Sequence, residues 1–247
     1  MKVLHLNTHT SGGSYEYAAL LSTGLLEQGI ESRLLCKTSP SSQTGRVLLD
    51  RVIRRAYVSA SREPWHGTRR LLCPPGSDEV KGVDVVHLHT MADWFDVPTW
   101  LQTLPTGVRV VISVHDMWHV TGGCFLYRGC QRYSDSCTPC PILKSPFNWV
   151  LARDERKRKL QGYRNSRARF VANSFWLAKL AGHSPVVNAC GGVDVIPPGI
   201  DTTVFKLHDK ALCRKYLDLP ADAFVIVTGG ASLTNTNKNV PWLLEQL

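Results

Sequence analysis

The 247-residue sequence contains no uninterrupted apolar run of about 18 residues, the length that a membrane-spanning helix needs. It also has no secretion signal at its start, because the opening stretch 1–7 is short and soon turns polar. Internal repeats, low-complexity segments and the G-x-G-x-x-G motif are all absent, so a dinucleotide site is not supported. These absences predict a globular protein of the cytoplasm.

Negative charge is scarce relative to positive charge. The chain has 29 Lys and Arg against 20 Asp and Glu, a formal net charge of +9. Such an excess favours an anionic partner, which would be a phosphorylated substrate, a nucleic acid or an anionic lipid surface, although a merely soluble basic surface also explains it. Nucleic acid is the least favoured of these partners, because the basic residues are spread over several segments with few alternating aromatics.

Two segments of the chain concentrate this positive charge. An amphipathic helix is predicted over Val47–Ala60, with several arginines between 46 and 55, and a second basic helix over Phe147–Tyr163. A basic amphipathic helix can lie on an anionic membrane, which would place the protein peripherally at the inner face. For the helix Val47–Ala60, the alternative is a solvated helix face.

Short apolar segments alternate with segments of helical periodicity. Strands are predicted at Val3–Asn7, Ile30–Lys37, Val83–His89, Val108–Val114, Ala168–Asn173 and Val193–Ile196, and helices at Tyr17–Gln28, Asp93–Leu104, Phe147–Tyr163 and Phe175–Ala181. This alternation is typical of an α/β protein with a doubly wound parallel sheet.

A domain boundary is predicted at the connector Pro197–Asp201, because its prolines and glycine make it stiff. It divides the chain into residues 1–198 and 199–247. The second part contains a predicted strand at Phe224–Thr228 and a helix that begins near Asn239 and does not finish. One strand and one helix cannot bury their own apolar faces, so we expect a complete first domain and the opening of a truncated second one.

Polar residues that could take part in binding or catalysis follow the predicted strands. His115 and Asp116 come directly after Val108–Val114, and His87 and His89 end Val83–His89 on one face of that strand. The carboxyl ends of parallel strands are where α/β proteins place their chemistry. For the histidine pair, metal binding is conceivable, and packing under a helix is the commoner outcome.

The loop after the first strand contains Gly12 and Gly13, immediately before a predicted helix. Glycines allow a ligand to approach the backbone, and a helix N-terminus favours an anion. A plain tight turn explains the spacing equally well.

Four of the eight cysteines are clustered. Cys124, Cys130, Cys137 and Cys140 are separated by five, six and two residues. In a chain without a secretion signal, this pattern favours a structural Zn²⁺ site of four thiolates over a disulfide framework. An iron–sulfur cluster and unliganded thiols are the alternatives, and His119 is near enough in sequence to replace one cysteine.

The order of these motifs resembles the retaining glycosyltransferases of family 4, also called group 1. The resemblance runs from Met1 to Leu247. It rests on the Gly12-Gly13 loop and on the segments Asp84–His89, Val114–Asp116, Val171–Trp176, Ile196–Phe205 and Phe224–Asn239. The cysteine segment also resembles a subgroup that acts on envelope or extracellular polysaccharide.

This resemblance implies the GT-B fold, in which two Rossmann-like domains face each other across a cleft. It implies transfer of a sugar from a nucleotide-sugar donor to a glycan or lipid-linked acceptor, generally without a catalytic metal. His115 would be the catalytic group near the transferred sugar. Gly12, Gly13 and Lys238 would bind the donor, whose departing diphosphate needs a fixed cation. His89 and Asp116 would lie on the acceptor side.

Two departures from the family pattern affect these expectations. The family's arginine after the first strand of the second domain cannot be placed in the loop 229–232, and the carboxylates that hold the donor are not found. We therefore expect little or no turnover by this chain alone. A non-catalytic interaction module or a basic, zinc-containing nucleic-acid-binding protein remains the alternative.

Overall fold

The computed structural model describes residues 1–37, 52, 56–58, 65–68, 73–230, 233 and 238–247. The chain divides into two compact units, Met1–Gly199 and Ile200–Leu247, which are described separately below. Most of the helix expected over Val47–Ala60 lies outside the described residues, so its expected position on a membrane stays a prediction. Among the helices that are described, none is long and apolar enough to cross a membrane.

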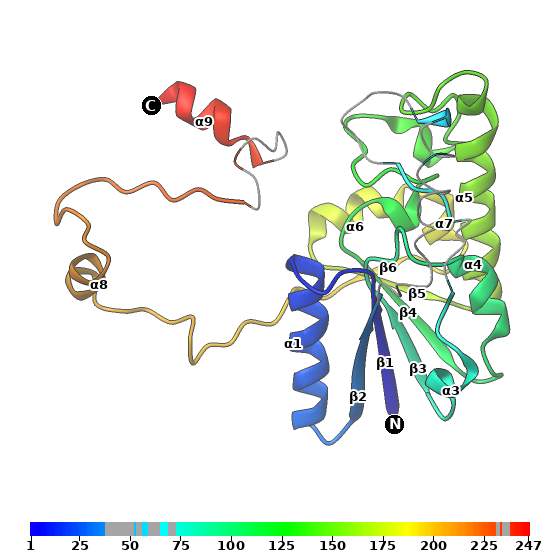
Figure 1. Cartoon of the computed structure of the whole chain (residues 1–247), viewed down its shortest axis with the longest axis horizontal. Helices are drawn as coiled ribbons and strands as arrows, with labels where there is room; N and C mark the ends of the chain where they lie inside the picture. Colours follow the sequence, from blue (N-terminus) through cyan, green and yellow to red (C-terminus); the bar gives the residue numbers. More distant parts are fainter. Residues whose placement is uncertain (38–51, 53–55, 59–64, 69–72, 231–232, 234–237) are drawn as a thin grey trace. The chain divides into compact units, whose positions relative to one another are not determined.

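The first unit is built on six parallel strands in the order β2-β1-β3-β4-β5-β6 (Figure 1). The strands are β1 (Lys2–Asn7), β2 (Glu31–Cys36), β3 (Val85–Leu88), β4 (Arg109–Val114), β5 (Arg169–Ala172) and β6 (Val193–Val195). The predicted α/β parallel sheet is therefore confirmed. The chain adds β2 on one side of β1 and then crosses to β3 on the other, so the winding direction reverses between β1 and β3. Ligands of open α/β sheets bind at this reversal, outside the carboxyl ends of the strands.

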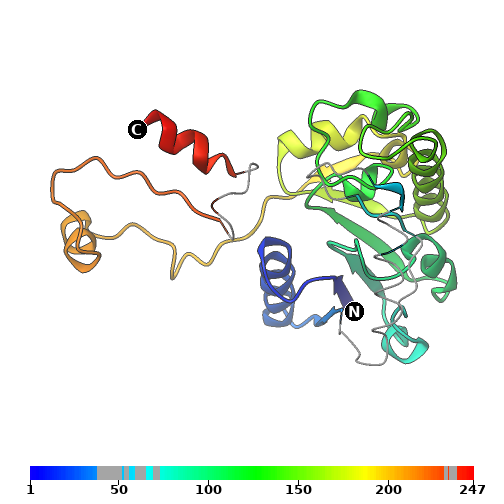
Figure 2. The same ribbon diagram turned by 45° about the horizontal axis from the view of Figure 1, so that its top comes forward.

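Helices cover both faces of the sheet. They are α1 (Gly13–Glu27), α3 (Ser77–Val80), α4 (Val97–Trp100), α5 (Phe147–Asn165), α6 (Phe175–Gly182) and α7 (Pro185–Asn188). Figures 1 and 2 show α1 on one side of the sheet and α5 on the other. This two-sided cover explains why the strands are almost continuously apolar: a parallel strand is buried on both faces. Leu4, Leu6, Val86, Leu88 and Ile112 are fully buried as a result.

Helix starts follow their capping residues. The Ser174 hydroxyl accepts a hydrogen bond from the Leu177 amide at 3.3 Å, which makes Ser174 the N-cap of α6. The helix expected over Asp93–Leu104 is shorter than predicted. Asp96 caps it through the Thr99 amide, so α4 begins at Val97 and passes into a 3₁₀ turn after Trp100.

Helix α5 does not present its basic residues to solvent as a single face. Lys159 is fully buried and Arg156 is 8% exposed, so these two basic residues are not available to an anionic surface. Arg158 forms an ion pair with Asp96 of the neighbouring helix cap. The adjacent acid, Glu155, is buried and accepts hydrogen bonds from the amide and the hydroxyl of Thr68 at 2.6 and 2.5 Å. The helix is therefore held to the unit by polar as well as apolar contacts.

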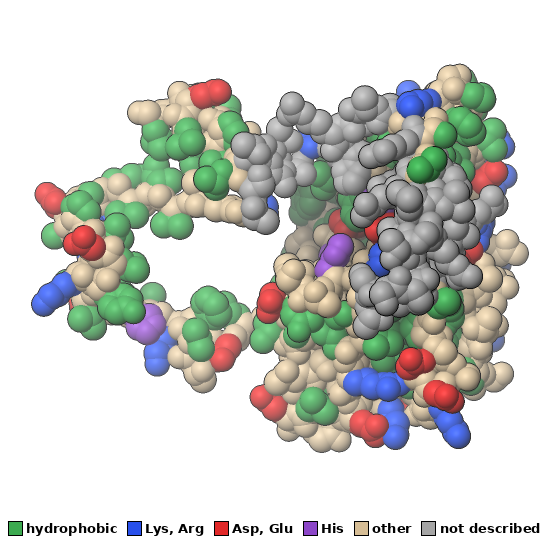
Figure 3. Space-filling model, in the orientation of Figure 1, with side chains coloured by type: hydrophobic (Ala, Val, Ile, Leu, Met, Phe, Trp, Pro, Cys, Tyr) green, Lys and Arg blue, Asp and Glu red, His purple; other side chains and the backbone are tan. Residues whose placement is uncertain are grey.

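The second unit contains the helices α8 (Lys210–Tyr216) and α9 (Val240–Gln246). Residues 224–228, where the sequence predicts a strand, are not a strand in this structure, because no other strand is described in this unit to satisfy their backbone. Phe224 and Val227 are largely exposed. Figure 3 shows hydrophobic side chains gathered along this unit.

We predict opposite effects of alanine at two helical glycines. A Cβ at Gly162 of α5 would meet the Cα and Cβ of Pro98 at 2.8 and 2.7 Å, whereas a Cβ at Gly24 of α1 would meet nothing within 4 Å. Gly162→Ala should lower the free energy of unfolding by about 1–3 kcal/mol, the usual cost of overpacking. Gly24→Ala should raise it by up to about 1 kcal/mol, because alanine favours helix. Urea unfolding measures both, and equal effects would contradict the close packing of α4 on α5.

Candidate functional site

The candidate site lies at the carboxyl edge of the sheet, around the winding reversal. Gly12 and Gly13 follow β1, His89 follows β3, and His115 and Asp116 follow β4. These three strands are neighbours, so the sheet brings the predicted residues of the first unit to one edge. Tyr17 of α1 joins them, with its ring 4.9 Å from the His115 ring in an edge-to-face arrangement.

The two glycines open the backbone at the start of α1. Gly12 is the N-cap and has φ of 86°, a conformation that other residues adopt only with strain. A Cβ at either glycine would meet no atom within 4 Å, so the space above both residues is open. No side chain caps the first amides of this helix. An anionic group could therefore approach them.

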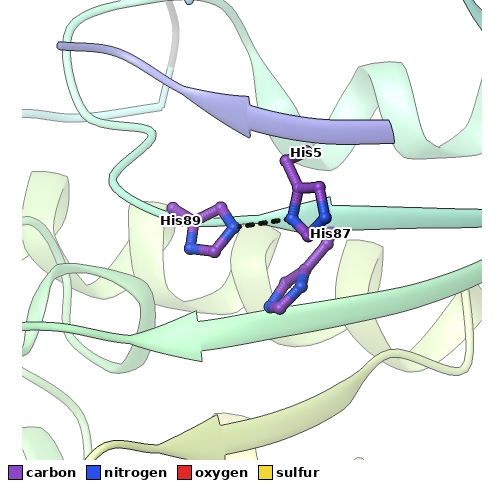
Figure 4. A group of neighbouring side chains, drawn as sticks. All are labelled: His5, His87 and His89. Carbon is purple, nitrogen blue, oxygen red and sulfur yellow. Dashed lines mark hydrogen bonds between the residues drawn. The ribbon is translucent and has the colours of Figure 1, made fainter. Parts of the chain in front are cut away.

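A continuous chain of imidazoles runs inward from His115. Its Nε2 lies 3.1 Å from Nδ1 of His89, and His89 Nε2 lies 3.1 Å from Nδ1 of His5. His5 and His87 face each other in register on β1 and β3, and Figure 4 shows both beside His89. The His87 and His89 rings are 4.3 Å apart, and His87 Nε2 lies 2.8 Å from the Ser113 hydroxyl.

Burial keeps these rings neutral at physiological pH. Loss of solvent lowers the pKa of His5 and of His115 to about 4. Burial, with smaller repulsion from neighbouring histidines, lowers the pKa of His87 to about 3. The same two causes hold the pKa of His89 well below its usual value. A charged ring in this array would lack both water and a counter-ion.

Neutral rings can be ordered in two directions along this chain. In one, His115 donates through Nε2, and its Nδ1 is an acceptor. In the other, His5 donates first, and His115 presents a donating Nδ1–H. The Nε2 atom of His5 has no hydrogen-bond partner among the described residues in either case. His115 can therefore face a ligand as acceptor or donor without a change of net charge.

Three of these histidines form a possible metal-ligand set. One nitrogen from each of His5, His87 and His89 lies within 4.8 Å of the others, and no other such group occurs in the described part of the chain. Neutral imidazoles suit Zn²⁺ and similar ions. However, one nitrogen of His5 and one of His89 already bond to each other, so those two atoms are not free for a metal in this arrangement. The sequence prediction of packed histidines under a helix fits this arrangement.

Asp116 is tied to the loop that follows it. Its Oδ1 accepts a hydrogen bond from the Trp118 amide at 2.8 Å. Burial raises its pKa to about 6, against the opposing effects of the Trp118 amide and of Lys159. The Lys159 ammonium donates to the carbonyls of Trp118 and Thr121 and lies 3.8 Å from the centroid of the Trp118 ring. Helix α5 thus holds the loop that carries Asp116.

His119 is part of the core and not a partner of the cysteines. Its Nε2 donates to the His89 carbonyl at 2.6 Å, and its Nδ1 accepts from the Tyr163 hydroxyl at 3.0 Å. Both ring nitrogens are occupied, so the expectation that His119 could replace a cysteine was wrong. Burial lowers its pKa to about 3.

The four clustered cysteines line one cavity of about 310 Å³, together with Trp65 and Tyr133. All eight cysteines of the chain are free thiols. Cys137 and Cys140 are buried, and burial raises the pKa of Cys124 to about 12 and that of Cys137 to about 11. The four cysteines belong to the loop between β4 and α5, which begins with His115 and Asp116.

Lys238, the predicted diphosphate partner, belongs to the second unit. It is exposed and precedes Asn239, which has φ of 54° at the start of α9. Its donor-binding role stays a prediction.

The fold and this edge define an α/β protein with a parallel sheet and polar groups collected at its winding reversal. The family model that describes Glycosyltransferase Family 4 matches residues 11–204 of the 247. The chain therefore belongs to glycosyltransferase family 4, and its first unit is a Rossmann-like domain consistent with the N-terminal domain of a GT-B enzyme. A comparison with curated proteins gave no match.

Sequence reasoning missed three contributors to the site. His5 was hidden inside an apolar strand, and only its register with His87 shows its place. Tyr17 resembled an ordinary core position of a helix. Lys159 resembled a surface charge, although it is fully buried. The period-two spacing of His87 and His89 was the one available signal, because it indicates a histidine-rich face that a neighbouring strand could extend.

We predict that the first unit loses stability on mild acidification. Between pH 6.5 and the lowered pKa values, the unfolded chain binds protons that the folded array does not, so the free energy of unfolding falls as pH falls. Each such histidine contributes about 1.4 kcal/mol per pH unit inside that window. Asp116 acts in the opposite direction, because its raised pKa stabilises the fold as it protonates below about pH 6.

Urea unfolding between about pH 7 and about pH 5 measures this slope. His5→Gln should make the slope shallower, and His183→Gln at an exposed position should leave it unchanged. A stability that stays constant over this range would contradict a neutral imidazole array.

Proposed function

We propose that this protein is a retaining glycosyltransferase that moves a sugar from a nucleotide-sugar donor to a glycan or lipid-linked acceptor. The observation that carries the proposal is the neutral His115 imidazole at the end of β4. Its Nε2 atom bonds to His89, and its Nδ1 atom would be the one to meet a ligand. The resemblance of the cysteine segment supports an acceptor used in envelope or extracellular polysaccharide synthesis.

The proposed mechanism assigns a separate task to each group. The open backbone at Gly12 and Gly13 would receive the donor diphosphate, whose charge the helix N-terminus stabilises. Lys238 would neutralise the same diphosphate as it departs. His115 would hydrogen-bond the transferred sugar and hold it in a reactive orientation. His89 is buried beneath His115, so it would act by orienting that ring.

Asp116 would act on the acceptor side. A carboxyl with a pKa of about 6 is partly protonated near neutral pH and can accept or release a proton there. No metal is required in this scheme, because fixed cations and amides carry the charge of the leaving group. A nucleic-acid-binding module is less well supported, since the buried Arg156 and Lys159 do not belong to an accessible basic face.

We predict that His115→Ala lowers kcat at least about 100-fold, the usual lower bound for loss of a positioned hydrogen-bonding or proton-transferring side chain. The assay follows release of nucleoside diphosphate from a panel of nucleotide sugars, with glycan and lipid-linked acceptors, using the protein as it occurs in the cell. His183→Ala, an exposed change, is the matched control. Unchanged turnover in His115→Ala would remove this residue from the mechanism, and no release from any donor would refute glycosyl transfer.

We further propose a cytoplasmic location with peripheral attachment to an anionic inner membrane, where a lipid-linked acceptor would be found. The start of α5 supports this, because Phe147, Trp149 and Val150 are 43%, 57% and 48% exposed and Lys157 is exposed on the same helix. Exposed apolar side chains on a helix that also carries an exposed cation suit a membrane interface.

We predict that the double change Phe147→Ser and Trp149→Ser reduces flotation with anionic vesicles several-fold. Leu26→Ser on α1 removes an apolar side chain of similar exposure and should have no effect. Loss of binding in both variants, or in neither, would contradict attachment through α5.

A further inference from the structure

We infer that Cys124, Cys130, Cys137 and Cys140 together hold one Zn²⁺ ion in a closed, structural tetrathiolate site. All four side chains line the same cavity, within a segment of 17 residues, 124–140. Four thiolates satisfy the tetrahedral preference of zinc and leave no position for substrate. The site would therefore stabilise a loop and take no part in the sugar chemistry.

Backbone amides already point at two of the sulfur atoms. The Gly122 amide donates to Cys137 Sγ at 3.3 Å, and the amides of Ile142 and Leu143 hydrogen-bond to the Cys140 sulfur. Such bonds favour a sulfur that carries negative charge, and partners of this kind orient metal ligands. Cys137 also has φ of 60°, which is uncommon for a residue other than glycine. The loop is thus shaped to turn these sulfurs toward the cavity.

A buried cation with two unpaired nitrogens is the independent observation that favours a metal over plain thiols. Arg156 is 8% exposed, and its Nε and Nη1 atoms have no hydrogen-bond partner among the described residues. Arg156 and Lys159 both interact electrostatically with Cys137. Four neutral thiols would leave this buried guanidinium uncompensated, which is costly. Zinc with four thiolates carries a net charge of −2, part of which Arg156 would offset.

Zinc binding would require a local contraction of the loop. No three of the four sulfurs lie within 4.8 Å of one another. A tetrahedral site with Zn–S bonds of about 2.3 Å places its sulfurs about 3.8 Å apart. The loop is anchored where Trp65 pairs with Cys124 and where the Cys140 amide donates to the Asn148 carbonyl at 2.7 Å. The segment between these anchors would have to tighten for the four sulfurs to meet around one ion.

The experiment measures metal directly and does not depend on activity, so it can fail or succeed separately from the proposed glycosyl transfer. The full chain is purified without chelator, its zinc content is measured, and the zinc is then replaced by Co²⁺. We expect one zinc per chain and the visible absorption of tetrahedral cobalt bound to thiolates. Cys124→Ser and Cys137→Ser should each abolish cobalt binding, while Cys36→Ser and Cys190→Ser should retain it.

Two further variants keep the test decisive if a cysteine variant does not fold. Arg156→Met preserves bulk and should weaken zinc binding by about 10- to 100-fold, the usual effect of losing an outer-shell partner. Arg153→Met, one helical turn away, is its control. His5→Gln should leave the metal bound. The inference is overturned if the folded chain takes up no zinc or cobalt, if it contains iron or disulfides at these cysteines, or if His5→Gln removes the metal.

Discussion

The buried ammonium of Lys159 is the contact on which the functional edge depends. The loop between β4 and α5 has no strand of its own, and Lys159 holds it by donating to the carbonyls of Trp118 and Thr121. Burial lowers the pKa of this lysine to about 8, so the interaction is retained only because carbonyls, the Trp118 ring and nearby acids replace water. His115 and Asp116 begin this loop, and the cysteines end it. One cation from α5 therefore positions both chemical regions of the unit.

The edge combines a dry interior with an open rim. The imidazole chain is enclosed on its inner side by β1, β3 and α1, which keeps the rings neutral and fixed. The rim at Gly12 and Gly13 has no side chains, so a ligand can reach backbone amides there. The chain belongs to glycosyltransferase family 4, and the buried imidazoles and the open backbone suit two tasks of such a protein. Binding a charged nucleotide needs exposed hydrogen-bond donors, and orienting a sugar needs a rigid side chain.

Much of the fold was predictable from the sequence, because it depends on local patterns. The apolar strands and the segments of helical periodicity each depend on neighbouring residues, and they indicated where most elements of the first unit lie. The length of helix α4 was overestimated, because nothing in its apolar spacing shows that Asp96 caps it.

The imidazole chain was only half predictable. His89 and His115 follow strands, but the contribution of His5 depends on β1 lying beside β3, which is a property of the whole sheet. The inward turn of Arg156 and Lys159 was hidden for the same reason, since a lysine that faces the core has the same local sequence as one that faces water.

The two possible directions of the imidazole chain have a consequence for how the site could be observed. Reversing the chain relocates protons only, and every carbon and nitrogen keeps its place. The reversal has to balance, because one proton must enter at His115 Nδ1 while another leaves the buried Nε2 of His5, which has no hydrogen-bond partner among the described residues. Such a change is invisible to methods that locate heavy atoms, and ¹⁵N chemical shifts of the histidine rings would reveal it. The imidazole chain ends inside the core at the unpaired Nε2 atom of His5, and its other end is His115.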